Sequence, residues 1–84
     1  MRIRNADEKI IEIRKNPQRA SGRTRKTLNK VGPLFVLEKE ERTSLGAVVR
    51  IHVRNLTTNW HGWFSVFEIV YEDYTGPLTE KDFK

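Results

Sequence analysis

Residues 47–55, AVVRIHVRN, alternate apolar and polar side chains along most of their length. Successive side chains of a β-strand point to opposite faces, so this segment has one apolar and one polar side. That pattern is typical of an antiparallel sheet that packs one face on a core and turns the other to water. The apolar side consists of Val49, Ile51 and Val53, and the polar side of Arg50, His52 and Arg54.

Two further segments supply partners for this strand. Residues 34–41, LFVLEKEE, predict a preceding strand, and residues 43–46 predict the turn between the two. Residues 63–72, WFSVFEIVYE, are apolar on both faces, which indicates a third strand that is central or covered by a helix. The chain order predicts an antiparallel meander, and residues 34–41 at its edge would allow pairing with a second copy as a homodimer.

The N-terminal residues 5–15, NADEKIIEIRK, predict a helix. Asn5 and Glu8 have the spacing of a capping box. Ala6, Ile10 and Ile13 recur on one helical face, and Pro17 ends the segment because the residue before proline avoids helical dihedral angles. The expected fold is α+β: one small domain, residues 1–84, with this helix packed on a three-stranded antiparallel sheet.

The basic segment, residues 16–32, has two open interpretations. It is a second short helix if Ser21 caps the N-terminus and Gly32 and Pro33 end it, with Leu28 and Val31 turned inward. It is a flexible arm that orders on binding if the thin apolar stripe, and Gly22 at a cost of about 1 kcal/mol, prevent helix formation.

The charge is unevenly distributed. The net charge is +5, but residues 1–37 carry a balance of +7 and residues 38–84 a balance of −2, with no acid in residues 13–37. A basic surface of this kind favours nucleic acid, DNA or RNA, as the partner, with affinity from the phosphate backbone contacted by residues 14–30. The candidate side chains in this region are Arg14, Lys15, Arg19, Arg23, Arg25, Lys26 and Lys30.

The order of basic helix and β-hairpin resembles part of a winged helix-turn-helix. Recognition helices of that family often place Ser, Thr, a basic residue and Leu where this chain has Ser21, Thr24, Lys26 and Leu28. The resemblance implies DNA binding, with residues 34–53 as the wing. Only five residues separate Lys15 from Ser21, which leaves no room for the family's middle helix.

Two features of the predicted sheet extend the candidate interface. Arg50, His52 and Arg54 would form a basic stripe roughly 13 Å long, unless they form the ordinary wet face of a sheet with Glu38 and Glu40 as ion-pair partners. In NWHGW, residues 59–63, two tryptophans flank a loop. We expect Trp63 to be buried because it begins an apolar strand, whereas Trp60 is the candidate for stacking on bases.

The sequence argues against catalysis. It has no cysteine, no glycine-rich phosphate loop and two histidines, so we predict no enzyme, no cofactor and no metal site. The remote alternative is acid–base cleavage of RNA by His52 and His61. No segment has the length and apolar character of a membrane span, so we expect a cytoplasmic protein without a membrane partner.

The C-terminal residues 73–84 form an acidic tail that would lie against the protein's own basic segment or mark a protein-binding end. The alternative function is accordingly a small regulatory or inhibitory module, of the kind viral genomes encode, that docks on an acidic surface of a larger protein. Trp60, Tyr74 and Phe83 exposed in one patch would favour a protein partner. The same residues buried beneath a basic face would favour nucleic acid.

Overall fold

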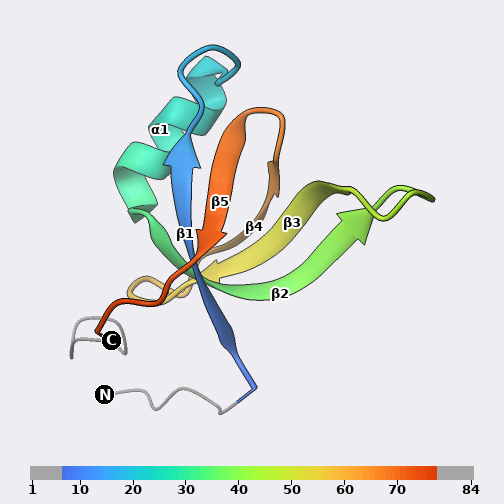
Figure 1. The fold of residues 1–84 in the computed structure, drawn as a ribbon. Coiled ribbons are helices and arrows are strands. Elements are labelled where there is room, and N and C mark those ends of the chain that lie inside the picture. Colours follow the sequence, from blue (N-terminus) through green and yellow to red (C-terminus); the bar gives the residue numbers. More distant parts are fainter. Residues whose placement is uncertain (1–6, 78–84) are drawn as a thin grey trace.

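The computed structural model describes residues 7–77, which form one helix and a five-stranded antiparallel sheet (Figure 1). The strand order is β4-β3-β2-β1-β5. The predicted three-stranded sheet with an N-terminal helix is therefore wrong. In chain order the elements are β1 (Lys9–Lys15), α1 (Gly22–Val31), β2 (Leu34–Arg42), β3 (Val48–Asn55), β4 (His61–Ser65) and β5 (Ile69–Asp73).

The segment predicted as the N-terminal helix forms strand β1, which pairs with both β2 and β5. Ile11 and Ile13 are buried on one face of the sheet and Ile10 on the other. A strand inside a sheet can bury β-branched side chains on both of its faces, so all three isoleucines are buried. In a helix, Ile11 would lie beside the apolar face formed by Ile10 and Ile13. Asn5 and Ala6, which supported the helix, lie outside the described residues.

The long apolar segment 63–72 is two strands rather than one. A turn separates β4 from β5, in which the Glu68 N–H donates to the Ser65 carbonyl oxygen at 3.2 Å and the Phe67 N–H donates to Ser65 Oγ at 3.2 Å. The two strands lie at opposite edges of the sheet, so neither is central. Strand β2 is interior, between β3 and β1, and the predicted edge at residues 34–41 is also wrong.

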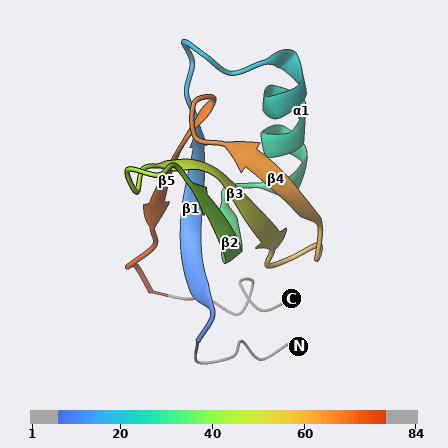
Figure 2. The same cartoon turned by 90° about the vertical axis from the view of Figure 1, so that its right-hand side faces the viewer.

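The short β4–β5 turn forces the sheet to curl. In a flat sheet, four strand spacings would separate the two edges by about 19 Å. Four Cα steps from Ser65 to Ile69 reach at most about 15 Å, and the turn hydrogen bond shortens that reach further. The sheet is therefore strongly curved, with β4 behind β5 in Figure 1 and α1 beside β4 in Figure 2.

The curled sheet buries residues on both faces. The larger cluster lies on the face that α1 covers, where Leu28 and Val31 pack against it. The Phe35 ring meets Phe64 and Trp60 edge-on, with ring centroids 5.6 and 6.5 Å apart. The smaller cluster, on the opposite face, consists of Ile10, Val36 and Leu56 with Leu34 and Tyr74 beside them.

The basic segment forms a helix in the structure, which was one of the two interpretations left open by the sequence. Ser21 is its N-cap, with Oγ accepting from the Thr24 N–H at 3.1 Å. At the other end Gly32 adopts φ of 81°, a conformation that glycine tolerates, and its N–H donates to the Leu28 carbonyl at 3.0 Å. No residue of α1 is fully buried, so tertiary attachments have to hold the helix on the sheet.

Candidate functional site

Two side chains from the sheet and its β4–β5 turn hold α1 at both of its ends. At the N-terminus, the Glu68 carboxylate in the β4–β5 turn accepts hydrogen bonds from the hydroxyls of Thr24 and Ser21, the latter at 3.2 Å. At the C-terminus, the Asn55 side-chain amide at the end of β3 donates to the Val31 carbonyl. The helix is thus fastened to the sheet at both of its ends by two side chains distant from it in sequence.

Glu68 supplies the negative charge that the helix itself lacks. The first turn of α1 contains no acid and carries Arg23, although the positive end of the helix dipole favours an acidic side chain there. The hydrogen bond from Thr24 is the main reason that the pKa of Glu68 lies below its usual value. Desolvation opposes this shift, while bonds from Ser21 and the charge of Arg23 add to it.

Asn55 connects the other end of α1 to the loop that precedes β4. The residue is 2% exposed. Its Oδ1 accepts from the backbone N–H groups of Thr57 and Thr58 at 2.9 and 2.7 Å, and from the Thr58 hydroxyl at 3.1 Å. One buried side chain therefore sets both the loop conformation and the position of the helix C-terminus.

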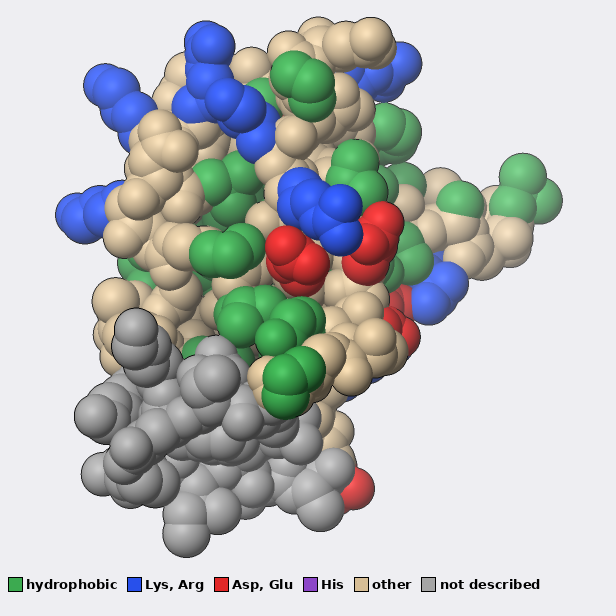
Figure 3. Space-filling view, turned by 60° about the vertical axis from the view of Figure 1, so that its left-hand side comes forward, with side chains coloured by type: hydrophobic (Ala, Val, Ile, Leu, Met, Phe, Trp, Pro, Cys, Tyr) green, Lys and Arg blue, Asp and Glu red, His purple; other side chains and the backbone are tan. Residues whose placement is uncertain are grey.

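Fastened in this way, α1 presents its cations to solvent. Six exposed basic side chains lie here: one from the end of β1, one from the following loop and four from the helix. We call them the α1 basic surface. Lys and Arg side chains project around this end of the molecule in Figure 3. The α1 basic surface consists of Lys15, Arg19, Arg23, Arg25, Lys26 and Lys30.

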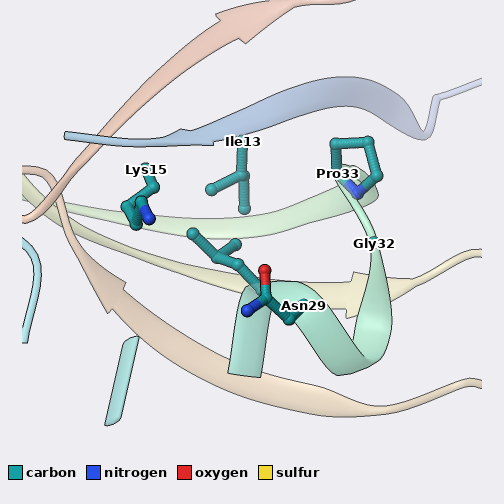
Figure 4. A pocket seen from close by; sticks show the side chains of 6 residues that line it. Ile13, Lys15, Asn29, Gly32 and Pro33 are labelled. Atoms are coloured by element: carbon teal, nitrogen blue, oxygen red, sulfur yellow. The ribbon is translucent and has the colours of Figure 1, made fainter. Parts of the chain in front are cut away.

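Lys15 and the helix line the same small hollow, which lies between β1 and α1. The hollow has a volume of about 190 Å³, and Figure 4 shows its lining side chains. Lys15 from the end of β1 and Asn29 from the helix both line it, with Leu28 and Ile13. Lys15 therefore lies next to the helix although it belongs to the sheet.

The six members of the α1 basic surface form no ion pair with any residue in 7–77. Five of the other six Lys and Arg side chains in that range do form one, so the difference follows location rather than residue type. The pairs are Lys9–Asp73, Arg14–Glu72 with Glu12, Arg42–Glu40, Arg50–Glu41, and Arg54–Glu8 with Glu38.

Arg14, which the sequence analysis also placed among the nucleic-acid-binding side chains, lies apart from this surface. Its guanidinium donates to the Glu72 carboxylate at 2.8 Å. Strand alternation puts Arg14 on the face opposite to Ile13 and hence away from α1. Asp73, at the start of the predicted acidic tail, pairs with Lys9 at 3.2 Å. Residues 78–84, which contain the rest of that tail, lie outside the described residues.

The predicted stripe on β3 is present, but acids accompany its charges. Arg54 is 6% exposed and donates to Glu8 at 2.6 Å. Arg50 donates to Glu41 at 2.5 Å. Of the two acids expected as partners, Glu38 lies 3.8 Å from Arg54, whereas Glu40 binds Arg42 and accepts from the Tyr71 hydroxyl.

The two histidines meet on this polar face. The His52 and His61 ring centroids are 6.1 Å apart, and Glu38 approaches their Nδ1 atoms at 3.8 and 3.0 Å respectively. The buried Nδ1 of His52 has no hydrogen-bond partner. Within residues 7–77 no group of three or more His, Asp and Glu side chains is arranged to hold a metal ion.

The two tryptophans have the opposite environments to those we expected. Trp60 is partly buried and packs on the core rings of Phe35 and Phe64. Trp63 is 43% exposed on the polar face, with the Arg50 guanidinium 4.4 Å from its ring centroid. Alternation along the edge strand β4 turns Trp63 outward, because Phe64 takes the inward position.

Sequence reasoning missed Glu68 and Asn55, the residues that position the helix. Glu68 does have a signal, since it is the only acid in residues 42–71 and lies within an apolar run. A lone carboxylate there needs hydrogen-bond donors from elsewhere in the fold. Asn55 ends a β-strand with an apolar–polar alternation and shows no comparable signal.

The winged-helix arrangement is not found, because β1 and a short loop precede α1 in place of further helices. Within residues 7–77 no helix is both long and apolar enough to cross a bilayer. Comparison of the chain with protein-family models, with curated proteins and with solved structures found no match.

Proposed function

We propose that the protein binds nucleic acid through the α1 basic surface. The observation that carries this proposal is the absence of ion pairs between these six cations and the rest of residues 7–77, while five of the other six basic side chains are paired. Exposed cations without ion pairs, gathered on and beside one helix, suit a polyanion, because each phosphate contact releases condensed counterions.

The placement of positive charges that destabilise α1 supports the same proposal. Arg23 and Arg25 lie near the positive end of the helix dipole, and Arg23, Lys26 and Lys30 follow one another along one helical stripe. Like charges at these spacings destabilise a helix. Local violations of this kind are expected where a surface serves function rather than folding.

The placement of the aromatic residues removes one argument for a protein partner at the α1 basic surface. Trp60 belongs to the cluster under α1, whereas Tyr74 packs against the cluster on the opposite face and donates to the Pro77 carbonyl at 3.0 Å. They form no common exposed patch. Phe83 lies outside the described residues.

Binding of labelled single- and double-stranded DNA and RNA across a range of salt tests the proposal. We expect a steep fall of log K with log salt. The triple variant Arg23→Ala, Arg25→Ala, Lys26→Ala reduces the slope by about 2 to 3, since each phosphate contact contributes about 0.7 to 0.9.

The matched control removes three cations that have ion-pair partners: Lys9→Ala, Arg14→Ala, Arg42→Ala. Both variants lose the same net charge, so only the location of the cations differs. An equal loss of affinity in the two variants, or no binding by the unmodified protein at low salt, overturns the proposal. The second result would mean that the basic segment faces an acidic protein or the chain's own acidic residues 73–84.

A further inference from the structure

Phe67, in the turn between β4 and β5, is the most exposed aromatic side chain in residues 7–77. It is 55% exposed, and Trp63 follows at 43%. The Trp63 ring lies against the Arg50 guanidinium and the His52 ring, whereas the Phe67 ring has no stacking or cation–π partner in residues 7–77. Single exposed apolar side chains are common on proteins, so the surroundings of this ring decide what it can bind.

The turn holds the Phe67 backbone in one position. The Phe67 N–H donates to Ser65 Oγ at 3.2 Å, and the Glu68 N–H donates to the Ser65 carbonyl at 3.2 Å. The Glu68 carbonyl accepts from the Asn16 N–H at 3.0 Å, which joins the turn to the loop after β1. The Glu68 carboxylate also fastens the turn to the N-terminus of α1. The ring is therefore presented on a preorganised backbone, which lowers the entropy cost of binding a ligand.

Members of the α1 basic surface border this turn. Figures 1 and 2 show the turn at the same end of the molecule as the loop that leads into α1. Lys15 pairs with Ile69, two residues beyond Phe67, in the register of β1 with β5. Arg19 lies in the loop that is bonded to the turn, and its N–H donates to the Asn16 carbonyl at 3.2 Å. Cations therefore lie near Phe67 both at the end of β1 and in the loop that follows it.

The charge around the turn is positive. Arg23, in the first turn of α1, is close enough to Glu68 for its charge to help lower the pKa of that carboxyl. Three cations therefore border the turn against one acid, whose carboxylate already accepts hydrogen bonds from two hydroxyls. The next acid along β5, Glu72, pairs with Arg14 on the face away from α1. This balance favours an anionic ligand beside the Phe67 ring.

A flat apolar ring bordered by cations matches the chemistry of an unpaired nucleotide. Proteins bind single strands by combining cations along the phosphates with aromatic side chains on which bases stack. Within a duplex, neighbouring base pairs cover the faces of each base, so a ring on a protein surface can stack only on an unpaired base. We propose that the protein binds single-stranded nucleic acid, with one base stacked on Phe67 and the adjoining phosphates at Lys15, Arg19 and Arg23. This inference rests on the proposed function and narrows it to single strands.

Affinity for a short oligo(dT) and for an abasic oligonucleotide of the same length tests this inference. The two ligands carry the same phosphate charge and differ only in their bases. We expect the unmodified protein to bind oligo(dT) about 5- to 150-fold more tightly, which is the range for the stacking of one base. Phe67→Ala is expected to lose most of that difference, while its affinity for the abasic strand and its salt dependence stay unchanged because no cation is removed.

Three further variants separate stacking from other effects. Phe67→Tyr keeps an aromatic face and is expected to retain the affinity of the unmodified protein, whereas Phe67→Leu has no π-face and is expected to resemble Phe67→Ala. Val70→Ala removes another apolar side chain, 46% exposed, and is expected to change nothing. In the unmodified protein, the ring-proton resonances of Phe67 should shift upfield with oligo(dT) but not with the abasic strand. That shift decides alone if the Phe67 variants do not fold.

Two results overturn the stacking on Phe67 and leave nucleic-acid binding intact. One is equal affinity of Phe67→Ala and the unmodified protein for oligo(dT), while the triple variant Arg23→Ala, Arg25→Ala, Lys26→Ala binds more weakly. The other is an equal loss of affinity by Phe67→Ala for a blunt duplex and for the single strand. Absence of any binding by the unmodified protein at low salt overturns this inference together with the proposed function.

Discussion

Glu68 and Thr24, 44 positions apart in the chain, are joined by a hydrogen bond from the threonine hydroxyl to the carboxylate. Thr24 occupies the helix position at which a capping box carries Glu or Gln. Here the carboxylate comes from the β4–β5 turn and reaches the same helix terminus through space. One side chain thereby performs the local task of a cap and the tertiary task of fixing α1 relative to β4.

We expect Glu68→Gln to lower the stability of the protein at neutral pH. We also expect the stability of this variant to fall less than that of the unmodified protein as the pH is lowered. The pKa of Glu68 is lowered in the folded protein, chiefly by the bond from Thr24. The unfolded chain therefore binds more protons between the folded pKa and the ordinary value of about 4.3. The stabilisation is present above that ordinary value and is lost as pH falls through the folded pKa.

Thermal or urea unfolding between neutral pH and pH 3 measures this difference. The curves for Glu68→Gln and the unmodified protein converge at the acid end if Glu68 is responsible. Glu72→Gln is the control, because Glu72 pairs with Arg14 on an exposed surface. A constant offset between Glu68→Gln and the unmodified protein at every pH would contradict the assignment.

Asn55→Ala is expected to destabilise the protein by about 2 kcal/mol. The substitution removes the donor to the Val31 carbonyl and the acceptor for two backbone N–H groups, and groups left without partners in a folded protein cost about 1 to 3 kcal/mol each when water cannot replace them. In a domain of this size the midpoint of thermal unfolding falls by about 10 °C. Asn29→Ala, at an exposed position of α1, is expected to stay within about 0.5 kcal/mol.

Gly62→Ala is expected to displace the Trp60 indole. A methyl group at Gly62 would overlap the Trp60 ring, so the ring has to leave its contacts with Phe35 and Phe64. We expect a cost of about 1 to 3 kcal/mol and a red-shifted tryptophan emission. Gly22→Ala meets no heavy atom within 4 Å and is expected to be neutral or to stabilise the helix by up to about 1 kcal/mol. Equal stability and emission in the two variants would contradict the close packing of Trp60.

Tyr71→Phe is expected to remove a component of alkaline destabilisation. Burial raises the pKa of Tyr71 to about 12, and the hydrogen bond to Glu40 with its charge adds to the effect. A raised pKa gives stability that is fully present below the ordinary value of about 10 and is lost as pH rises toward 12. Phenolate absorbance during a pH titration, with unfolding measured in parallel, should show that Tyr71→Phe loses the late-titrating component and has a flatter stability curve above pH 10.

Local signals predicted some elements correctly. Residues 47–55 contain β3, and the helical alternative for the basic segment placed its ends correctly, with Ser21 as the N-cap and Gly32 after the last residue. These features depend on neighbours in the chain, since strand alternation, N-caps and positive-φ glycines each concern a few consecutive residues.

The errors arose where two structures satisfy the same pattern. Ile10 and Ile13 share a face in a helix, and Ile11 and Ile13 share a face in a strand, so the sequence KIIEIRK is compatible with both. Pairing with β2 and β5 decides for the strand. The apolar run 63–72 likewise contains a turn, whose Glu68 accepts hydrogen bonds from the N-cap Ser21 and from Thr24 of α1.

The sequence by itself determined the position of the cations, the strand character of residues 47–55 and where a helix in the basic segment would begin and end, because these are properties of composition and short-range geometry. Only the tertiary structure decided which cations are paired, since Arg50 and Arg54 form ion pairs with acids from other segments while the α1 basic surface forms none within residues 7–77. It also decided that Glu68 and Asn55 hold the helix beside an open strand edge. Those contacts join residues far apart in the chain, and no local pattern encodes a distance in space.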